Sequence, residues 1–112
     1  MSRGQRNRKE VLGLLPRDVA RDVKRAIAIL RRHGARRVIL YGSLARGDYR
    51  TDSDIDICFE GIPDEEYFRA VAECLMGIPR RISVMDLRDT HGAFRERINK
   101  EGKVLYERGT SS

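Results

Sequence analysis

The chain has 112 residues, of which 40% are hydrophobic and 36% are charged, so it has the size of one domain and is too apolar for wholesale disorder. No stretch approaches the ~20 consecutive apolar residues of a membrane span, and the first residues lack the apolar segment of a signal peptide, so we expect a cytoplasmic protein with no membrane association. The two cysteines, Cys58 and Cys74, show neither a disulfide framework nor metal-ligand spacing, and we interpret them as reduced thiols.

The net charge of +6 is unevenly distributed. Residues 1–41 contain twelve Lys/Arg and three Asp/Glu, whereas residues 42–112 contain eleven and fourteen. A basic surface beside a carboxylate cluster suits a polyanionic substrate, either phosphates or RNA. For any single residue, an ordinary solvated arginine side chain on a helix is an equally good interpretation.

The predicted elements begin after a basic segment, residues 1–10, which has no periodicity and is expected to be a flexible tail. A helix follows Pro16, because apolar residues recur there at steps of three and four and Gly34 provides a C-terminal cap. The apolar run at residues 38–41 predicts a buried strand that ends in a tight turn at Gly42.

The second half of the chain continues this alternation. Residues 44–53 are expected to form a short helical turn and then an exposed loop. Residues 53–59 alternate carboxylate and apolar side chains, which predicts a strand with one wet and one dry face. The remaining elements are a helix at 64–76, a strand at 81–87, a helix at 90–100 and an apolar segment at 104–106. This order indicates an α/β or α+β domain with a small sheet covered by helices.

Two aspartates at the start of the second strand form the strongest candidate site. Residues two apart on a strand project to the same face, so Asp54 and Asp56 stand roughly 6 to 7 Å apart while Ile55 and Ile57 face the core. Mg²⁺ binds through one or two carboxylates plus substrate phosphates and water, which suits such a pair. An Asp-X-Asp tripeptide alone is more often a polar strand edge, so the interpretation needs support from neighbouring residues.

The turn before this strand provides that support. Gly42 and Ser43 end the first strand and open a short helix, where backbone N–H groups, a hydroxyl and the positive end of a helix dipole can hold a triphosphate. Nucleotidyl transfer requires both a phosphate cradle and metal-binding carboxylates, because its catalysis is mostly positioning and charge stabilisation.

The same residues resemble the signature of the DNA polymerase beta-like nucleotidyltransferase superfamily. The matching residues are Gly42-Ser43, Ala45-Arg46-Gly47, Ser53 and Asp54-Ile55-Asp56. The chain looks most like the minimal nucleotidyltransferases, from about Arg17 to Arg108, and its ending at residues 102–107 also looks like theirs. The resemblance implies one nucleotidyltransferase domain at residues 11–108, built as a small mixed sheet with helices packed on one face, and a flexible C-terminus at 109–112.

The resemblance also implies roles for the site residues. Asp54 and Asp56 would be catalytic and would ligate Mg²⁺, Gly42 and Ser43 would hold the nucleotide phosphates, and Arg46 would support that loop or contact a phosphate. The implied activity is transfer of AMP from ATP to a hydroxyl of a partner protein. The implied partner is a HEPN-domain RNase toxin, for which the minimal nucleotidyltransferase serves as antitoxin. A homo-oligomer is also compatible with the sequence, and RNA binding through the basic residues of the first helix is a less favoured alternative.

One family carboxylate is missing from its usual place. Minimal nucleotidyltransferases commonly carry a third acidic residue on the next strand, at the position of Ser83. Strand parity points Ser83 into the site if Ile82 and Val84 pack under the helices, and Asp86 could serve instead if the strand bends or ends early. A hydroxyl is a poor Mg²⁺ ligand and no useful base at neutral pH, so the alternative function is a catalytically degenerate member that binds nucleotide and toxin.

A few other residues have weaker signals. Tyr41 and Tyr49 flank the nucleotide loop, and either could line the site. His33 is interpreted as a surface residue that interacts with the last carbonyls of the first helix. The helical spacing of the aromatic residues Tyr67, Phe68 and Phe94 is interpreted as core packing rather than as base stacking.

Overall fold

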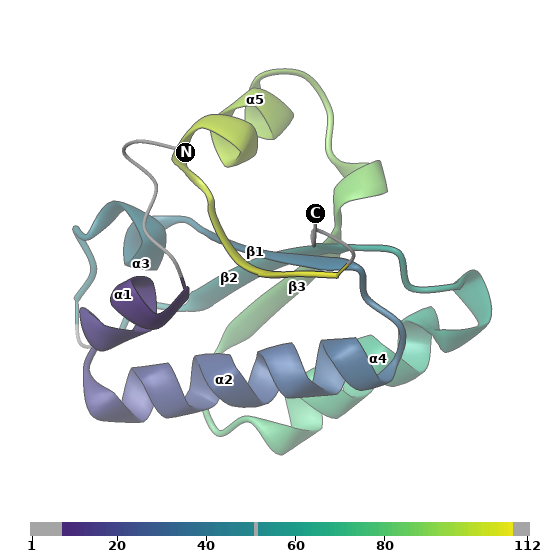
Figure 1. Ribbon diagram of the computed structural model, residues 1–112, viewed down its shortest axis with the longest axis horizontal. Helices are drawn as coiled ribbons and strands as arrows, with labels where there is room; N and C mark the ends of the chain where they lie inside the picture. Colours follow the sequence, from purple (N-terminus) through teal and green to yellow (C-terminus); the bar gives the residue numbers. More distant parts are fainter. Residues whose placement is uncertain (1–7, 51, 109–112) are drawn as a thin grey trace.

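The computed structural model describes residues 8–50 and 52–108 of the chain. A four-stranded sheet lies at the centre, with helices on both sides (Figure 1). Among the described residues, no helix combines the length and the apolar composition needed to cross a membrane. In chain order the elements are α1 (Arg8–Gly13), α2 (Arg17–Arg32), β1 (Arg37–Tyr41), α3 (Ser43–Arg46), β2 (Ile55–Glu60), α4 (Asp64–Gly77), β3 (Ile82–Asp86), the 3-10 turn η1 (Leu87–Asp89), α5 (Gly92–Glu101) and β4 (Lys103–Glu107).

The sheet is mixed, as the sequence predicts. Its strand order is β3-β2-β1-β4, and β1 pairs antiparallel with both β2 and β4. β2 and β3 pair in parallel, so the chain must cross from the end of one strand to the start of the next, and α4 makes this crossover. β2 is therefore an inner strand with a partner on each side.

Different helices cover the two faces of the sheet. α2 and α4 lie on the face that carries Val38 and Ile57, which are fully buried. On the opposite face, Ile39 and Cys58 form a smaller cluster with Ile98 of α5. The expectation that the helices pack on one face therefore holds for α2 and α4 but not for α5 (Figure 1), because β1 and β2 are apolar on both faces of their middle residues.

α2 covers its face through one apolar stripe. Val23, Ala26 and Leu30 recur at three- and four-residue spacing and have no exposed surface, and burying a Val or Leu side chain stabilises the fold by roughly 1.5–3 kcal/mol. Asp22 is also buried on this helix, and Arg80 compensates its charge by donating from Nε to Oδ2 at 3.2 Å. The segment after α4 is thereby tied to α2.

α1 is a helix that the sequence does not predict. The predicted tail covers residues 1–10, yet the helix starts at Arg8, because the buried side chains of Val11 and Leu12 pack into the core and favour a helical turn. The rest of that tail, residues 1–7, and the predicted flexible C-terminus at 109–112 lie outside the described residues.

The core assignment of the aromatic residues is wrong for Phe68. Its side chain is 81% exposed, whereas the neighbouring Tyr67 faces the sheet and packs against Phe59 with the ring centroids 5.9 Å apart. Adjacent positions on a helix point in directions about 100° apart, and here Tyr67 points to the sheet while Phe68 points to solvent. Phe94 of α5 remains 39% exposed and contacts Tyr41 instead of the main core.

The His33 side chain does not interact with the helix carbonyls. Its Nδ1 lies 2.8 Å from Oε1 of Glu66 and its Nε2 lies 2.7 Å from Oε1 of Glu73, so both ring nitrogens face carboxylates of α4. Both glutamates come from one side of that helix, because positions seven residues apart lie on the same face about two turns from each other. His33 therefore links the end of α2 to α4.

Candidate active site

The two aspartates lie at the edge of the sheet where β1 ends and β2 begins. Asp56 is the second residue of β2 and Asp54 immediately precedes the strand. In the strand register, Asp56 is opposite Tyr41 of β1 on one side and opposite Ser83 of β3 on the other. Residues directly opposite each other on neighbouring strands project to the same face. Tyr41, Asp56 and Ser83 therefore form one row across the three strands.

Gly42 brings the turn after β1 against the Asp56 carboxylate. Its φ of 75° and ψ of −158° lie in a region that is essentially restricted to glycine. A Cβ at this position would stand 2.3 Å from Oδ2 of Asp56, which is far inside van der Waals contact. The turn that starts α3 and the carboxylate of β2 are thus adjacent because residue 42 has no side chain.

The surroundings of Asp56 disfavour the charge on its carboxylate. Burial raises the pKa of Asp56, the nearby charge of Asp54 raises it further, and Arg46 opposes the shift. A site in which ionised carboxylates lie close together and partly desolvated gains free energy when it binds a cation. The electrostatics of this site therefore favour a bound positive charge between the aspartates.

Arg46 connects α3 to two other segments. Its Nε donates to Oδ2 of Asp48 at 3.2 Å, and its Nη1 donates to Oε1 of Glu101 at 3.4 Å. The guanidinium thus links the loop after α3 to the last residue of α5, at the same side as Asp56, whose pKa it lowers. These contacts fit the loop-supporting role that the resemblance implies, and they leave the side chain 40% exposed for a phosphate.

Arg81 is a site residue that the sequence interpretation missed. Its Nε lies 3.9 Å from Oδ1 of Asp54, and its side chain is 84% exposed. The Ile55 N–H donates to the Arg81 carbonyl at 3.0 Å, because the parallel strands β2 and β3 start side by side. The parallel pairing that would reveal this neighbour is not visible in the sequence, where Asp54 and Arg81 are 27 positions apart.

Asp86 does not supply the third carboxylate. It lies opposite Phe59 at the other end of β2, on the core side of the sheet, and is 1% exposed. Its carboxylate accepts from the backbone N–H of Arg88 at 2.9 Å and from Nε of the same residue at 3.1 Å. Ser83 is the residue beside Asp56, as strand parity predicts. In the described ranges, no group of three or more His, Cys, Asp or Glu side chains is arranged to hold a metal ion.

Tyr41 contributes a phenol to the same row. Burial raises the pKa of Tyr41, a hydrogen bond with the Ser83 side chain opposes this shift, and the charge of Asp56 adds to it. The ring packs edge-on against Phe94 with centroids 5.8 Å apart and an interplanar angle of 77°. Asp56 is therefore flanked in this row by two hydroxyl groups, those of Tyr41 and Ser83.

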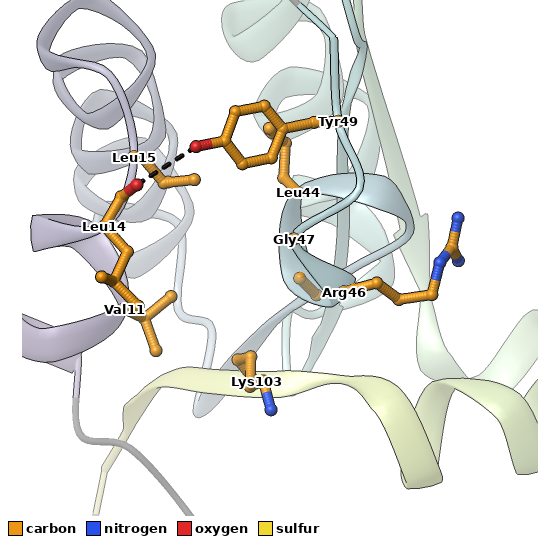
Figure 2. Close-up of a pocket in the computed structure, with 9 residues that line it drawn as sticks. Val11, Leu14, Leu15, Leu44, Arg46, Gly47, Tyr49 and Lys103 are labelled. Carbon is orange, nitrogen blue, oxygen red and sulfur yellow. Dashed lines mark hydrogen bonds between the residues drawn. The ribbon is translucent and has the colours of Figure 1, made fainter.

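Tyr49 lies away from the aspartates. Its hydroxyl donates to the Leu14 carbonyl at 3.1 Å across a pocket of about 380 Å³ between α1 and α3, which Figure 2 shows. Apolar side chains of α1 and α3 line this pocket together with Arg46 and Lys103, and Asp54 and Asp56 do not line it. Tyr49 thus fixes the loop after α3 to the α1–α2 connection, and of the two tyrosines only Tyr41 lies beside the carboxylates.

The residues present fit one divalent cation. Asp54 and Asp56 offer hard carboxylate oxygens close enough for the charge of Asp54 to act on Asp56, and Mg²⁺ needs only one or two such groups when phosphates and water complete its octahedron. The shift in the pKa of Asp56 has the direction expected when a cation is needed to neutralise the pair. A second ion bridged by three carboxylates does not fit, because Ser83 stands at the third position.

Comparisons with known proteins define the class to which this fold and site belong. A family model described as polymerase beta, nucleotidyltransferase matches residues 24–111, so the chain belongs to this nucleotidyltransferase family. A Methanocaldococcus jannaschii protein named as a protein adenylyltransferase is 33% identical over 79 residues, which make up 63% of this chain and 78% of that protein. The family that the sequence signature resembles is thereby confirmed.

Solved structures confirm the fold. A chain in the crystal structure of a toxin–antitoxin pair with AMP-PNP aligns with a TM-score of 0.61 at 21% identity, covering 72% of this chain and 69% of that one. A Sulfolobus solfataricus chain described as a nucleotidyltransferase aligns with a TM-score of 0.51 at 23% identity, covering 97% and 96%. The predicted polymerase beta-like architecture is therefore correct.

Proposed function

We propose that this chain transfers AMP from ATP to a hydroxyl group of a partner protein, with Mg²⁺ as the cofactor. The observation that carries the proposal is the contact between the Gly42 turn and the Asp56 carboxylate, since it joins a phosphate-binding turn to a cation-binding pair. The named activity of the Methanocaldococcus relative supports the protein acceptor. The toxin–antitoxin pair among the structural neighbours supports a toxin as that acceptor, and we propose a HEPN-domain toxin.

In this proposal the chain's own residues position the triphosphate. The first N–H groups of a helix have no partner within the helix, so α3 presents those of its first turn, together with the Ser43 hydroxyl, at the Gly42 turn. Arg46 and Arg81 add positive charge on either side of the aspartates. The acceptor hydroxyl attacks the α-phosphorus in line, the bond to the β-phosphate breaks and pyrophosphate leaves; Asp54 and Asp56 would hold Mg²⁺, which would supply charge neutralisation at the phosphates.

The row formed by Tyr41, Asp56 and Ser83 favours a second candidate function, binding without efficient transfer. Neither a serine nor a tyrosine hydroxyl is a useful base near neutral pH, because both keep their protons there, and burial moves the pKa of Tyr41 further upward. Asp56 alone would then have to accept the proton of the attacking hydroxyl. A chain that binds ATP and its toxin without turnover would retain every other feature of the site.

A labelling experiment separates the two functions. The chain is incubated with α-labelled ATP, Mg²⁺ and the protein encoded by the adjacent reading frame, and the label on that protein is measured. Label that disappears in the Asp54→Ala/Asp56→Ala double variant but remains in Asp52→Ala supports the enzyme, since Asp52 is a nearby exposed carboxylate outside the strand. A stable complex without label would support the binding function instead.

A substitution at position 83 tests the missing carboxylate directly. Ser83→Asp places an acid next to Asp56, and we expect at least a tenfold gain in transfer rate or in Mn²⁺ affinity, about 1.4 kcal/mol. Ser83→Asn is the matched control, because it has the same shape without the charge. Equal behaviour of the two variants would contradict the inference that position 83 limits the site.

A further inference from the structure

A groove runs along the solvent side of α2, which Figure 1 shows in front of the sheet with α1 near its start. The groove consists of three adjoining hollows, and the largest, of about 590 Å³, lies between α1 and the first half of α2. This hollow shares Leu12 and Lys24 with the second, and the second shares Ala28 and Arg31 with the third. Tyr106 of β4 lines the last hollow. We call the three together the α2 groove.

The rim of the α2 groove is cationic. Asp18 and Asp22 of the same helix lie on its other side, where both accept hydrogen bonds from Arg80. Among the described residues that line the groove, none is acidic and five are exposed cations. α2 therefore separates its charges, with the positive ones at the groove. The groove cations are Arg17, Arg21, Lys24, Arg31 and Arg32.

Most of this charge is not neutralised by the protein. Within the described part of the chain, Arg17, Lys24 and Arg31 have no ion pair closer than 4.0 Å. The other two groove cations each have one carboxylate neighbour. The guanidinium carbon of Arg31 lies 4.4 Å from the centre of the Tyr106 ring, a cation–π contact that holds this side chain at the end of the groove. At least three positive charges are therefore available to an anionic ligand.

The floor of the α2 groove is apolar. Leu12, Leu15 and Ile27 line it and are at most 8% exposed, and Ala28 lies between them and the cations. A cationic rim above an apolar floor suits a polymer that carries phosphates along one side and flat rings along the other. A guanidinium plane such as that of Arg31 also offers a surface on which a base can stack.

We propose that the α2 groove binds single-stranded RNA through its phosphates and base faces, without regard to sequence. From the sequence alone RNA binding through this helix is a less favoured alternative, because the sequence does not reveal the groove. Charged residues are depleted at the centre of protein–protein interfaces, whereas nucleic-acid interfaces are much more positively charged. A duplex stacks its bases inside, so only a single strand can place them on the floor, and RNA commonly exposes single-stranded loops and ends.

The length and the position of the α2 groove define the complex. From Arg17 to Arg31 the helix rises about 21 Å, which matches about six nucleotides at the 3.4 Å spacing of a stacked strand. α2 packs on the face of the sheet that carries Val38, whereas Asp56 lies in one row with Tyr41 on the opposite face. RNA in the groove therefore leaves the candidate active site open, and the proposal goes beyond the proposed transfer of AMP.

Fluorescence anisotropy with a labelled twelve-residue oligouridylate tests the proposal on the full-length chain, in EDTA so that Mg²⁺ takes no part. We expect a dissociation constant in the micromolar range at low salt, and a slope of log K against log[salt] of about −2 for three phosphate contacts. Lys24→Gln should flatten this slope by about 0.7, because it removes one contact. A wild-type chain that does not bind the oligonucleotide would overturn the proposal.

Charge reversal locates the binding surface. Lys24→Glu and Arg31→Glu should each weaken RNA binding at least fivefold. Arg97→Glu is the matched control, because it changes the net charge equally at an exposed position of α5, on the other face of the sheet, and should change the affinity less than twofold. Circular dichroism confirms that each variant is folded. Equal losses in the groove and control variants would overturn the assignment to the α2 groove.

Competition identifies the class of ligand. The same RNA annealed to its oligoadenylate complement should bind at least threefold more weakly, and polyglutamate at equal charge concentration should not displace the single strand. Single-stranded DNA of matched sequence should bind no more tightly than RNA. A duplex or a polyglutamate that binds as well as the single strand, or DNA that binds more tightly, would contradict the proposal. None of these measurements uses nucleotide transfer, so their failure is distinguishable from failure of the proposed activity.

Discussion

Substituting Gly42 by alanine tests whether the turn and the carboxylate share one space. The new Cβ would lie 2.3 Å from Oδ2, 3.1 Å from Cγ and 3.3 Å from Cβ of Asp56. A change of rotamer at Asp56 would remove the contacts with Oδ2 and Cγ but not the 3.3 Å contact with its Cβ. The Asp56 carboxylate must therefore leave its position, and the turn or the start of β2 must also shift by a few tenths of an ångström.

The expected cost follows from two contributions. A non-glycine residue held at φ 75° and ψ −158° is strained by about 1–3 kcal/mol, and the clash with Asp56 adds the cost of displacing a packed strand, at least ~1 kcal/mol. We therefore expect Gly42→Ala to lower the free energy of unfolding by about 2–4 kcal/mol, at the upper end of ordinary single substitutions.

Gly47→Ala is the matched control. Gly47 also has a positive φ, 92°, but a Cβ there meets no atom within 4 Å. Its cost should be limited to the left-handed conformation, about 1–2 kcal/mol. The two glycines lie at opposite ends of α3 and both have a positive φ. Comparing the costs of their alanine variants therefore separates backbone strain from the contact with Asp56.

Two measurements check this reasoning. Urea unfolding followed by circular dichroism gives the stabilities, and calorimetric titration with Mn²⁺ and a non-hydrolysable ATP analogue gives the affinities. Gly42→Ala should lose affinity at least tenfold while Gly47→Ala keeps it. In a double-mutant cycle, Asp56→Ala should recover about 1 kcal/mol of the Gly42→Ala cost. Equal costs for the two glycines, or no coupling to Asp56, would refute the steric argument.

Three further outcomes follow from the charges and burial. Burial and the neighbouring carboxylate raise the pKa of Asp56. Protonated Asp56 therefore favours folding, and this contribution to stability is lost as pH rises through the raised pKa. Asp56→Asn should stabilise the metal-free chain at neutral pH by up to ~1 kcal/mol. This gain should vanish in acid, and a pH-independent difference in urea unfolding would contradict it. Arg80→Ala removes the 3.2 Å hydrogen bond to the buried Asp22 carboxylate and leaves it only the ion pair with the exposed Arg21 at 3.6 Å. This variant should cost up to ~3 kcal/mol, part of which Asp22→Asn should restore in the same assay. Burial raises the pKa of Cys58 to about 12 and that of Cys74 to about 11, so neither thiol should react with a disulfide reagent at neutral pH until urea unfolds the chain.

The elements that the sequence predicts well are those with a strong local period. The apolar spacing of α2 and the alternation along β2 both reflect packing on one continuous surface. Each element can therefore be predicted from residues that are close together in the sequence. The same parity argument places Ser83 beside Asp56, and the strand register agrees. The turn at Gly42 is predictable because glycine, a hydroxyl and a strand end occur together in the chain.

Features that depend on tertiary neighbours are not readable in this way. The Asp86 carboxylate accepts hydrogen bonds from Arg88 and lies on the core side of the sheet. Its sequence context had left it a candidate metal ligand. The position of Arg81 next to Asp54 requires the parallel pairing of β2 and β3. The exposure of Phe68 requires knowing which of two adjacent aromatic residues faces the sheet.

The location of Asp56 on an inner strand has a consequence for motion. β2 is hydrogen-bonded on both sides, so its amides should exchange with deuterium only when the whole domain opens. α3 contains four residues and ends in a left-handed glycine, a length at which a helix is held by its surroundings and opens locally. The half of the site on β2 is thus rigid, whereas the half on α3 can change conformation when a triphosphate binds. If a bound nucleotide slowed amide exchange in α3 and left amide exchange in β2 unchanged, this difference in mobility would be demonstrated.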